Sequence, residues 1–131
     1  MIPVQVGADE RMVVDGVMLV DTGSNVTILD TEVAANLNLP EVSKSAIHTF
    51  DDGKETAASY RRALLVIPRV AEAGIAIDVL CSDCSRIHVG SGLPGGATRV
   101  IGILGRDVLR HCLLVYDGKA GTILLNFDVG G

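Results

Sequence analysis

The sequence predicts an all-β, single-domain fold, residues 1–131, with one or two short helices. Its segments are short, rich in β-branched residues and separated by turn residues, which is typical of barrels and sandwiches. The 131 residues suffice for one domain. Apolar residues make up 48% of the chain but aromatic residues only 3%, so the core must be aliphatic. We therefore expect a single closed barrel or sandwich rather than a parallel α/β sheet.

Val-rich, partly alternating stretches open the chain. Residues 3–7 and 11–20 are predicted to be strands, because turn residues at 8–10 separate them, and a second break is expected at Asp15-Gly16. A short apolar run follows at residues 26–29.

A short helix is expected after this run. Asp30 or Thr31 can cap a helix over residues 32–37, since either side chain can accept a hydrogen bond from a free backbone N–H of the first turn. Pro40 prevents the helix from continuing.

The strongest tight-turn signal comes from four consecutive residues, Asp51, Asp52, Gly53 and Lys54. Asp-Gly tolerates the positive φ angles of a type I′ hairpin turn. The flanking residues 47–50 and 56–60 are therefore expected to pair as a projecting hairpin.

The second half of the chain continues the β pattern. A glycine-rich loop is expected over residues 90–96, a helical turn over 107–112, and a hairpin turn at Asp117-Gly118. Further strands are expected at residues 64–67, 75–80, 100–104, 113–116 and 122–127.

Charge and hydropathy exclude two classes of partner. The formal net charge is -5, and the basic residues are scattered apart from Arg61-Arg62, which is a poor surface for a phosphate backbone. No nucleic-acid partner is therefore expected. The longest run without a formal charge, residues 87–98, is glycine-rich and shorter than the roughly 20 apolar residues of a membrane helix, so no membrane span is expected.

Composition also indicates compartment and assembly. The start of the chain has neither a basic segment nor an apolar signal core, so a cytoplasmic location is expected unless the chain is cut from a longer precursor. Three cysteines are too few, and odd in number, for a secreted disulfide framework. The mean hydropathy of +0.41 is high for a small domain, which favours an oligomer.

Two segments carry residue types suited to chemistry. In the first, an acid ends the apolar strand 11–20 and would be partly desolvated there. The four residues of this loop are Asp21, Thr22, Gly23 and Ser24. The second segment follows the apolar strand 100–104 and enters a helix, with Asp107 expected as N-cap. Its residues are Leu104, Gly105, Arg106 and Asp107.

Asp-Thr-Gly-Ser after an apolar strand, followed about 80 residues later by Ile-Leu-Gly-Arg-Asp, resembles the retropepsin-like aspartic proteases. These are single-domain, dimeric relatives of pepsin, found in retroviruses and encoded in bacteria. The resemblance covers most of the chain and implies a closed acid-protease barrel. The long stretch over residues 77–98 is more similar to cellular and bacterial members. Asn25 stands where the viral pattern usually has an acid that would pair with Arg106.

The resemblance implies an aspartic endopeptidase acting on a peptide or protein substrate, with no metal or organic cofactor. Peptide hydrolysis needs a base for water and an acid for the carbonyl, and two close carboxylates sharing one proton supply both. Because the chain has one Asp-Thr-Gly, the second carboxylate would be Asp21 of a second copy across a twofold axis. Thr22 would hydrogen-bond across that axis, residues 104–107 would support the loop, and residues 51–54 would close as a flap.

Alternatives remain open for both patterns. Asp21 to Ser24 are all turn residues and could merely follow a strand. Cys81 and Cys84, with His88 four residues further on, have a spacing that can hold zinc. The second reading of the chain is therefore a non-catalytic protein-binding or dimerisation module of the same fold, with a zinc knuckle at these three residues.

Overall fold

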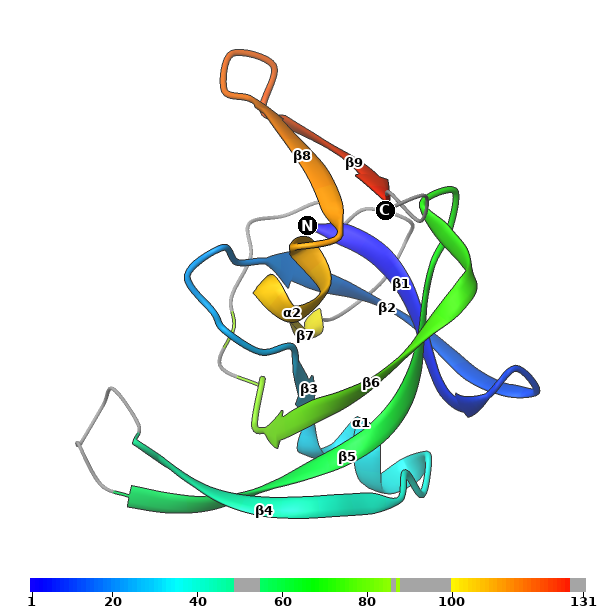
Figure 1. The fold of residues 1–131 in the computed structure, drawn as a ribbon, viewed down its shortest axis with the longest axis vertical. Helices are drawn as coiled ribbons and strands as arrows, with labels where there is room; N and C mark the ends of the chain where they lie inside the picture. Colours follow the sequence, from blue (N-terminus) through cyan, green and yellow to red (C-terminus); the bar gives the residue numbers. More distant parts are fainter. Residues whose placement is uncertain (49–54, 86, 88–99, 128–131) are drawn as a thin grey trace.

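The computed structural model describes residues 1–48, 55–85, 87 and 100–127. The turn predicted at residues 51–54, the loop predicted at 90–96 and His88 lie outside the described residues. Within them the chain is mostly β, with two short helices (Figure 1). The strands are β1 (Ile2–Asp9), β2 (Met12–Val20), β3 (Ile28–Asp30), β4 (Glu41–His48), β5 (Glu55–Ile67), β6 (Ala71–Ser82), β7 (Val100–Leu104), β8 (Cys112–Asp117) and β9 (Thr122–Phe127). The helices are α1 (Thr31–Asn36) and α2 (Arg106–Leu109).

Six strands close into a barrel. They follow the order β1-β2-β7-β3-β6-β5, and β5 returns to β1 through pairs that run from Gln5–Val66 to Gly7–Leu64. β4 continues the sheet beyond β5. The expected all-β architecture is confirmed, and of the two expected forms it is the closed barrel. Two neighbouring pairs, β2–β7 and β3–β6, are parallel, so the sheet is mixed.

Aliphatic side chains fill the barrel, as the composition predicts. In β1 the alternation places Val4 and Val6 inward, each 1% exposed, with Gln5 between them half-buried. Burying one such side chain contributes roughly 1.5–3 kcal/mol. Further members of this core are Met18, Leu29, Leu65, Ile67, Leu104 and Val108.

Both helices begin after a residue that suits the N-cap position, but only one cap was predicted correctly. Asp30 caps α1 by accepting the Val33 N–H, as expected. α2 starts at Arg106 with Gly105 as N-cap, so the prediction that Asp107 is the cap is wrong. Neither helix of the described residues has the length or apolarity to cross a lipid bilayer.

Three boundaries differ from the sequence prediction because tertiary pairing overrides local signals. The break expected at Asp15-Gly16 is wrong, since β2 is continuous there and both residues pair with β1. The helical turn expected over 107–112 ends at Leu109, since Cys112 pairs with Phe127 in a strand. The strands expected at 56–60 and 64–67 are one continuous β5 of 13 residues. This strand is hydrogen-bonded to β4, β6 and β1 in turn, which keeps its whole length extended.

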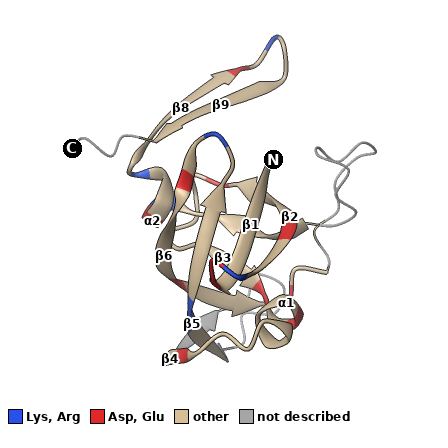
Figure 2. Cartoon of the chain, turned by 90° about the vertical axis from the view of Figure 1, so that its right-hand side faces the viewer, with Lys and Arg blue, Asp and Glu red and all other residues tan. Residues whose placement is uncertain are grey.

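The last two strands form a separate hairpin that projects from the barrel (Figures 1 and 2). The inner face of the hairpin contributes Leu125, 7% exposed, to the core. Its outer face carries Leu113, Val115 and Leu124, which are 62%, 45% and 64% exposed. The hairpin is therefore apolar on both faces.

Candidate active site

Asp21 lies directly after β2, where the strand leaves the barrel. β2 and β7 run parallel, with Val20 opposite Leu104. The Asp21 backbone N–H donates to the Leu104 carbonyl oxygen at 3.0 Å, so the ladder continues one residue past the strand. This bond determines where the loop begins and leaves Asp21 half-buried at the barrel end.

One oxygen of the Asp21 carboxylate is held by its own loop. The Gly23 N–H donates to Oδ1 at 2.9 Å, and the Ser24 N–H donates to the Asp21 backbone carbonyl at 3.2 Å. Within the described residues nothing donates to Oδ2. A Cβ at position 23 would lie 3.1 Å from Oδ1, so glycine prevents crowding of the carboxylate. The loop thus orients the acid and leaves one oxygen open to water or a substrate.

Of the other three loop residues, two are exposed and the third is hydrogen-bonded to a nearby backbone carbonyl. Thr22 and Gly23 are exposed. Ser24 is half-buried, and its hydroxyl donates to the Val26 carbonyl at 2.7 Å. The four residues predicted for the loop therefore form one tight turn with the Thr22 side chain on its outer surface.

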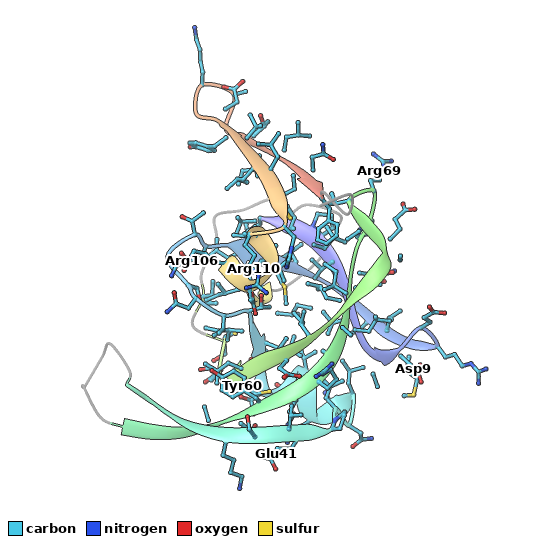
Figure 3. All side chains as sticks on the ribbon, in the orientation of Figure 1. Asp9, Glu41, Tyr60, Arg69, Arg106 and Arg110 are labelled. Carbon is cyan, nitrogen blue, oxygen red and sulfur yellow. The ribbon has the colours of Figure 1, made fainter. Side chains whose placement is uncertain are left out.

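The segment predicted to support the loop does contact it. A Cβ on Gly105 would collide with the Val26 carbonyl, so the two backbones approach as closely as glycine permits. The Arg106 N–H donates to the Ser24 carbonyl at 2.8 Å, and its guanidinium Nη1 donates to the Thr22 carbonyl at 2.9 Å. Figure 3 shows Arg106 beside the loop after β2. Arg106 thus holds two backbone carbonyls of the loop, one through its own N–H and one through its guanidinium.

Arg106 bonds to the main chain where the viral pattern would have an ion pair. Asn25 is exposed, and within the described residues the one ion pair of the chain joins Arg62 to Asp78. The guanidinium therefore contributes loop geometry rather than charge neutralisation.

Thr27 belongs to the same network, and sequence analysis missed it. It is 0% exposed, its backbone N–H donates to Asp107 Oδ2 at 3.0 Å, and its hydroxyl donates to Asp107 Oδ1 at 2.7 Å. Asp107 reaches the loop from inside α2, which explains why it does not cap that helix. The available signal was a hydroxyl residue inside the apolar run 26–29, a place where a buried polar group needs a partner.

Of the two flanks expected to pair around the flap turn, residues 56–60 pair with residues 43–47 of β4, and the other flank, 47–50, is described only as far as His48. β4 and β5 are antiparallel from Glu41–Arg61 to His48–Glu55, and they extend from the barrel as a long ribbon (Figure 1). The predicted turn residues lie outside the described residues. The pairing therefore supports a hairpin at this place and leaves its function a prediction.

The cysteines of the zinc alternative are buried thiols. Cys81 lies on β6, and burial raises the pKa of its thiol above 9.0. Cys84 is 3% exposed, and its N–H donates to Asp30 Oδ1 at 2.9 Å. In the described part of the chain no three His, Cys, Asp or Glu side chains are placed to hold a metal ion. His88, the third ligand of that alternative, is outside this part.

Fold and site together define a closed β-barrel with an acidic loop held at the end of a parallel strand pair. A scan against protein-family models finds no match, and a search of curated proteins finds none either. A functional assignment therefore depends on the chemistry of the loop.

Proposed function

We propose that this chain is an aspartic endopeptidase of retropepsin type, acting as a homodimer on peptide or protein substrates. The observation that carries the proposal is the state of Asp21. Asp21 is half-buried as a residue, its carboxylate is oriented through Oδ1, and within the described residues nothing bonds to Oδ2. Its loop is bonded to the segment 104–107. A plain turn would not need a second segment, about 80 residues away in sequence, to hold it.

The reaction needs two carboxylates with one proton between them. The ionised Asp21 takes a proton from water as the water oxygen attacks the peptide carbonyl carbon, and the protonated Asp21 of the partner polarises the carbonyl oxygen. On collapse of the tetrahedral intermediate, Asp21 passes the proton it took from water to the amine nitrogen and the C–N bond breaks. The hydroxyl formed from the carbonyl oxygen returns its proton to the partner's Asp21, which restores the singly protonated pair. Two like charges about 3 Å apart cannot easily both ionise, so only the singly protonated pair is active. The mechanism uses no metal or organic cofactor.

Exposed apolar side chains support the homodimer. The outer face of the β8–β9 hairpin exposes Leu113, Val115 and Leu124 to solvent in the single chain. This hairpin begins at Cys112, three residues after α2, whose first residue bonds to the Asp21 loop. An exposed apolar surface thus follows directly in the chain on the segment that is bonded to the Asp21 loop. A twofold axis that brings two Asp21 residues together would pass close to that segment.

The β4–β5 ribbon supports a role in substrate binding. Among the described residues β4 is the last strand of its sheet and pairs with β5 alone, so its other edge can pair with an extended peptide. We propose that the connection after His48 closes over the substrate as a flap, with Asp51, Asp52, Gly53 and Lys54 at its tip.

Digestion of a peptide library tests the proposal. Wild type should cleave peptides with a bell-shaped pH profile, and Asp21→Asn should abolish cleavage while leaving the fold intact by circular dichroism. The matched control is Asp9→Asn, since Asp9 Oδ1 also accepts a backbone N–H two residues further on but Asp9 is the last residue of β1, at the turn to β2. Equal cleavage by wild type and Asp21→Asn, or a rate that rises steadily into alkaline pH, would refute the proposal. Stoichiometric metal in an inactive protein would favour the zinc-bearing binding module.

A further inference from the structure

Asp107 bonds twice to a residue that precedes it by 80 positions. Its Oδ2 accepts the Thr27 N–H at 3.0 Å, and its Oδ1 accepts the Thr27 hydroxyl at 2.7 Å. Oδ1 also accepts the N–H of Val108 at 2.9 Å. The carboxylate therefore links α2 directly to the segment that ends the Asp21 loop.

The donor groups determine the direction of the hydrogen bonds around Thr27. The Thr27 hydroxyl oxygen accepts the Gly105 N–H at 3.1 Å, so its own proton is free to point to Asp107. Thr27 is 0% exposed and Gly105 is also buried, so water cannot replace a lost partner without structural change. Each hydrogen-bonding group in the network Gly105–Thr27–Asp107 has a partner, and the network therefore specifies one arrangement of these three residues.

The network anchors the end of the loop opposite to Asp21. At the beginning of the loop, the Asp21 N–H is bonded to Leu104. At its end, the Thr27 carbonyl accepts the Leu80 N–H at 3.0 Å, and the Thr27 N–H and hydroxyl are held by Asp107. Of these anchors, only the one at Asp107 depends on side chains.

We propose that Asp107 is a positioning residue for Asp21, acting through Thr27 to hold the active loop in its reactive geometry. This inference rests on the proposed function. Asp107 acts at the far anchor of the loop and does not touch the reacting atoms. Its role is separate from that of Arg106, which holds the middle of the loop through the Thr22 and Ser24 carbonyls.

Three substitutions isolate the interaction. Asp107→Asn keeps the size of the side chain but turns one acceptor into a donor facing either the N–H or the hydroxyl of Thr27. Thr27→Val removes the hydroxyl at constant volume, and Thr27→Ser retains it. Asp9→Asn is the control, because Asp9 accepts the Arg11 and Met12 N–H groups in a turn at the far tip of the β1–β2 hairpin (Figure 3).

Steady-state kinetics of these variants should separate a positioning role of Asp107 from a general loss of folded protein. We expect Asp107→Asn and Thr27→Val to lower kcat about 100-fold with little change in KM, the size expected for a small misplacement of the reacting groups. Thr27→Ser should retain most activity, and the double variant Thr27→Val/Asp107→Asn should be no worse than either single one. Wild-type kcat in Asp107→Asn, or equal losses in Thr27→Ser and Thr27→Val, would overturn the inference.

Two readouts do not depend on peptidase activity. Amide hydrogen exchange at Thr27 and Gly105 should accelerate about tenfold to a hundredfold in Asp107→Asn and stay unchanged in Asp9→Asn. The carbon-13 chemical shift of the Asp21 carboxyl, read at one fixed pH, should change in Asp107→Asn only. If wild type cleaves no peptide, the proposed function fails. These two readouts then still test whether Asp107 is coupled to the Asp21 loop. Unchanged hydrogen exchange and an unchanged chemical shift of the Asp21 carboxyl would then overturn the inference.

Discussion

Asp21 differs from the other turn aspartates of the chain in its surroundings, not in its local geometry. Asp9, Asp83 and Asp117 each accept the N–H of the residue two positions on, as Asp21 does. Those three are exposed, whereas Asp21 is half-buried and its own N–H is bonded to a neighbouring barrel strand. The plain-turn interpretation therefore explains the carboxylate contact but not the position of the residue.

One buried thiol, Cys81, and one half-buried thiol, Cys112, predict a loss of stability in alkali. Burial raises the pKa of Cys81 and of Cys112 above the ordinary value of 9.0. Below pH 9 both thiols are protonated in the folded and unfolded states, so their contribution is complete. Above it the unfolded chain releases these protons first, and the free energy of unfolding falls as pH rises through the folded pKa. Urea titrations between pH 8 and 10 should show this decline, with a shallower slope in Cys81→Ala than in wild type. Identical slopes for wild type and Cys81→Ala would contradict the inference that the Cys81 thiol contributes to this decline.

At the scale of elements, the β8–β9 hairpin is the part least explained by a single chain. A two-stranded sheet is at most marginally stable alone, and here its inner face packs on the core while its outer face stays apolar and exposed. Among the described residues, large apolar side chains are also exposed near Met12, at the start of β2, and at Val42, at the start of β4. Met12 lies nine residues or about 30 Å from Asp21 along β2. Of these three surfaces, the hairpin is the one that follows α2 directly in the chain.

Charge placed on the hairpin should therefore weaken self-association. Leu124→Glu puts a carboxylate on the outer face without disturbing the inner one, and we expect the dimer dissociation constant to rise about tenfold or more. Met12→Glu, at a comparably exposed position of 56%, should leave it unchanged. Sedimentation equilibrium measures both. Equal weakening by the two variants would place the interface elsewhere.

At the scale of the whole molecule, the proposed site is complete only when two chains meet. The barrel brings the Asp21 loop against residues 104–107 through the parallel β2–β7 pair, but each chain supplies one Asp-Thr-Gly. A reaction that needs two carboxylates must then take one from each protomer.

Subunit mixing tests this shared site. Wild type and Asp21→Ala are unfolded together and refolded at fixed total concentration. Alanine removes the proton acceptor and the carbonyl-polarising group together, so mixed dimers should be inactive and activity should follow the square of the wild-type fraction. Mixing with Asp9→Ala is the control, and activity there should stay constant. A straight line with Asp21→Ala, once subunit exchange is shown, would mean that each chain carries a complete site.

Local signals in the sequence determined much of this protein. Turn residues and β-branched segments predicted most of the strands, though not residues 41–46 of β4. Asp30 predicted the start of α1, and Asp117-Gly118 predicted the last hairpin. The Asp-Thr-Gly-Ser loop and the Leu104–Asp107 segment were both visible as motifs. These features depend on residues close together in the chain, so their physics can be read from neighbours alone.

Only the tertiary structure decided how these parts meet. Closure of the barrel requires β5 to pair with β1, and the length of β5 follows from its three partners. Asp107 has the local signature of an N-cap, yet its carboxylate bonds to Thr27 because the fold buries that hydroxyl beside it. A partner 80 residues away leaves no local pattern, and burial, which makes the bond obligatory, exists only once the chain has folded.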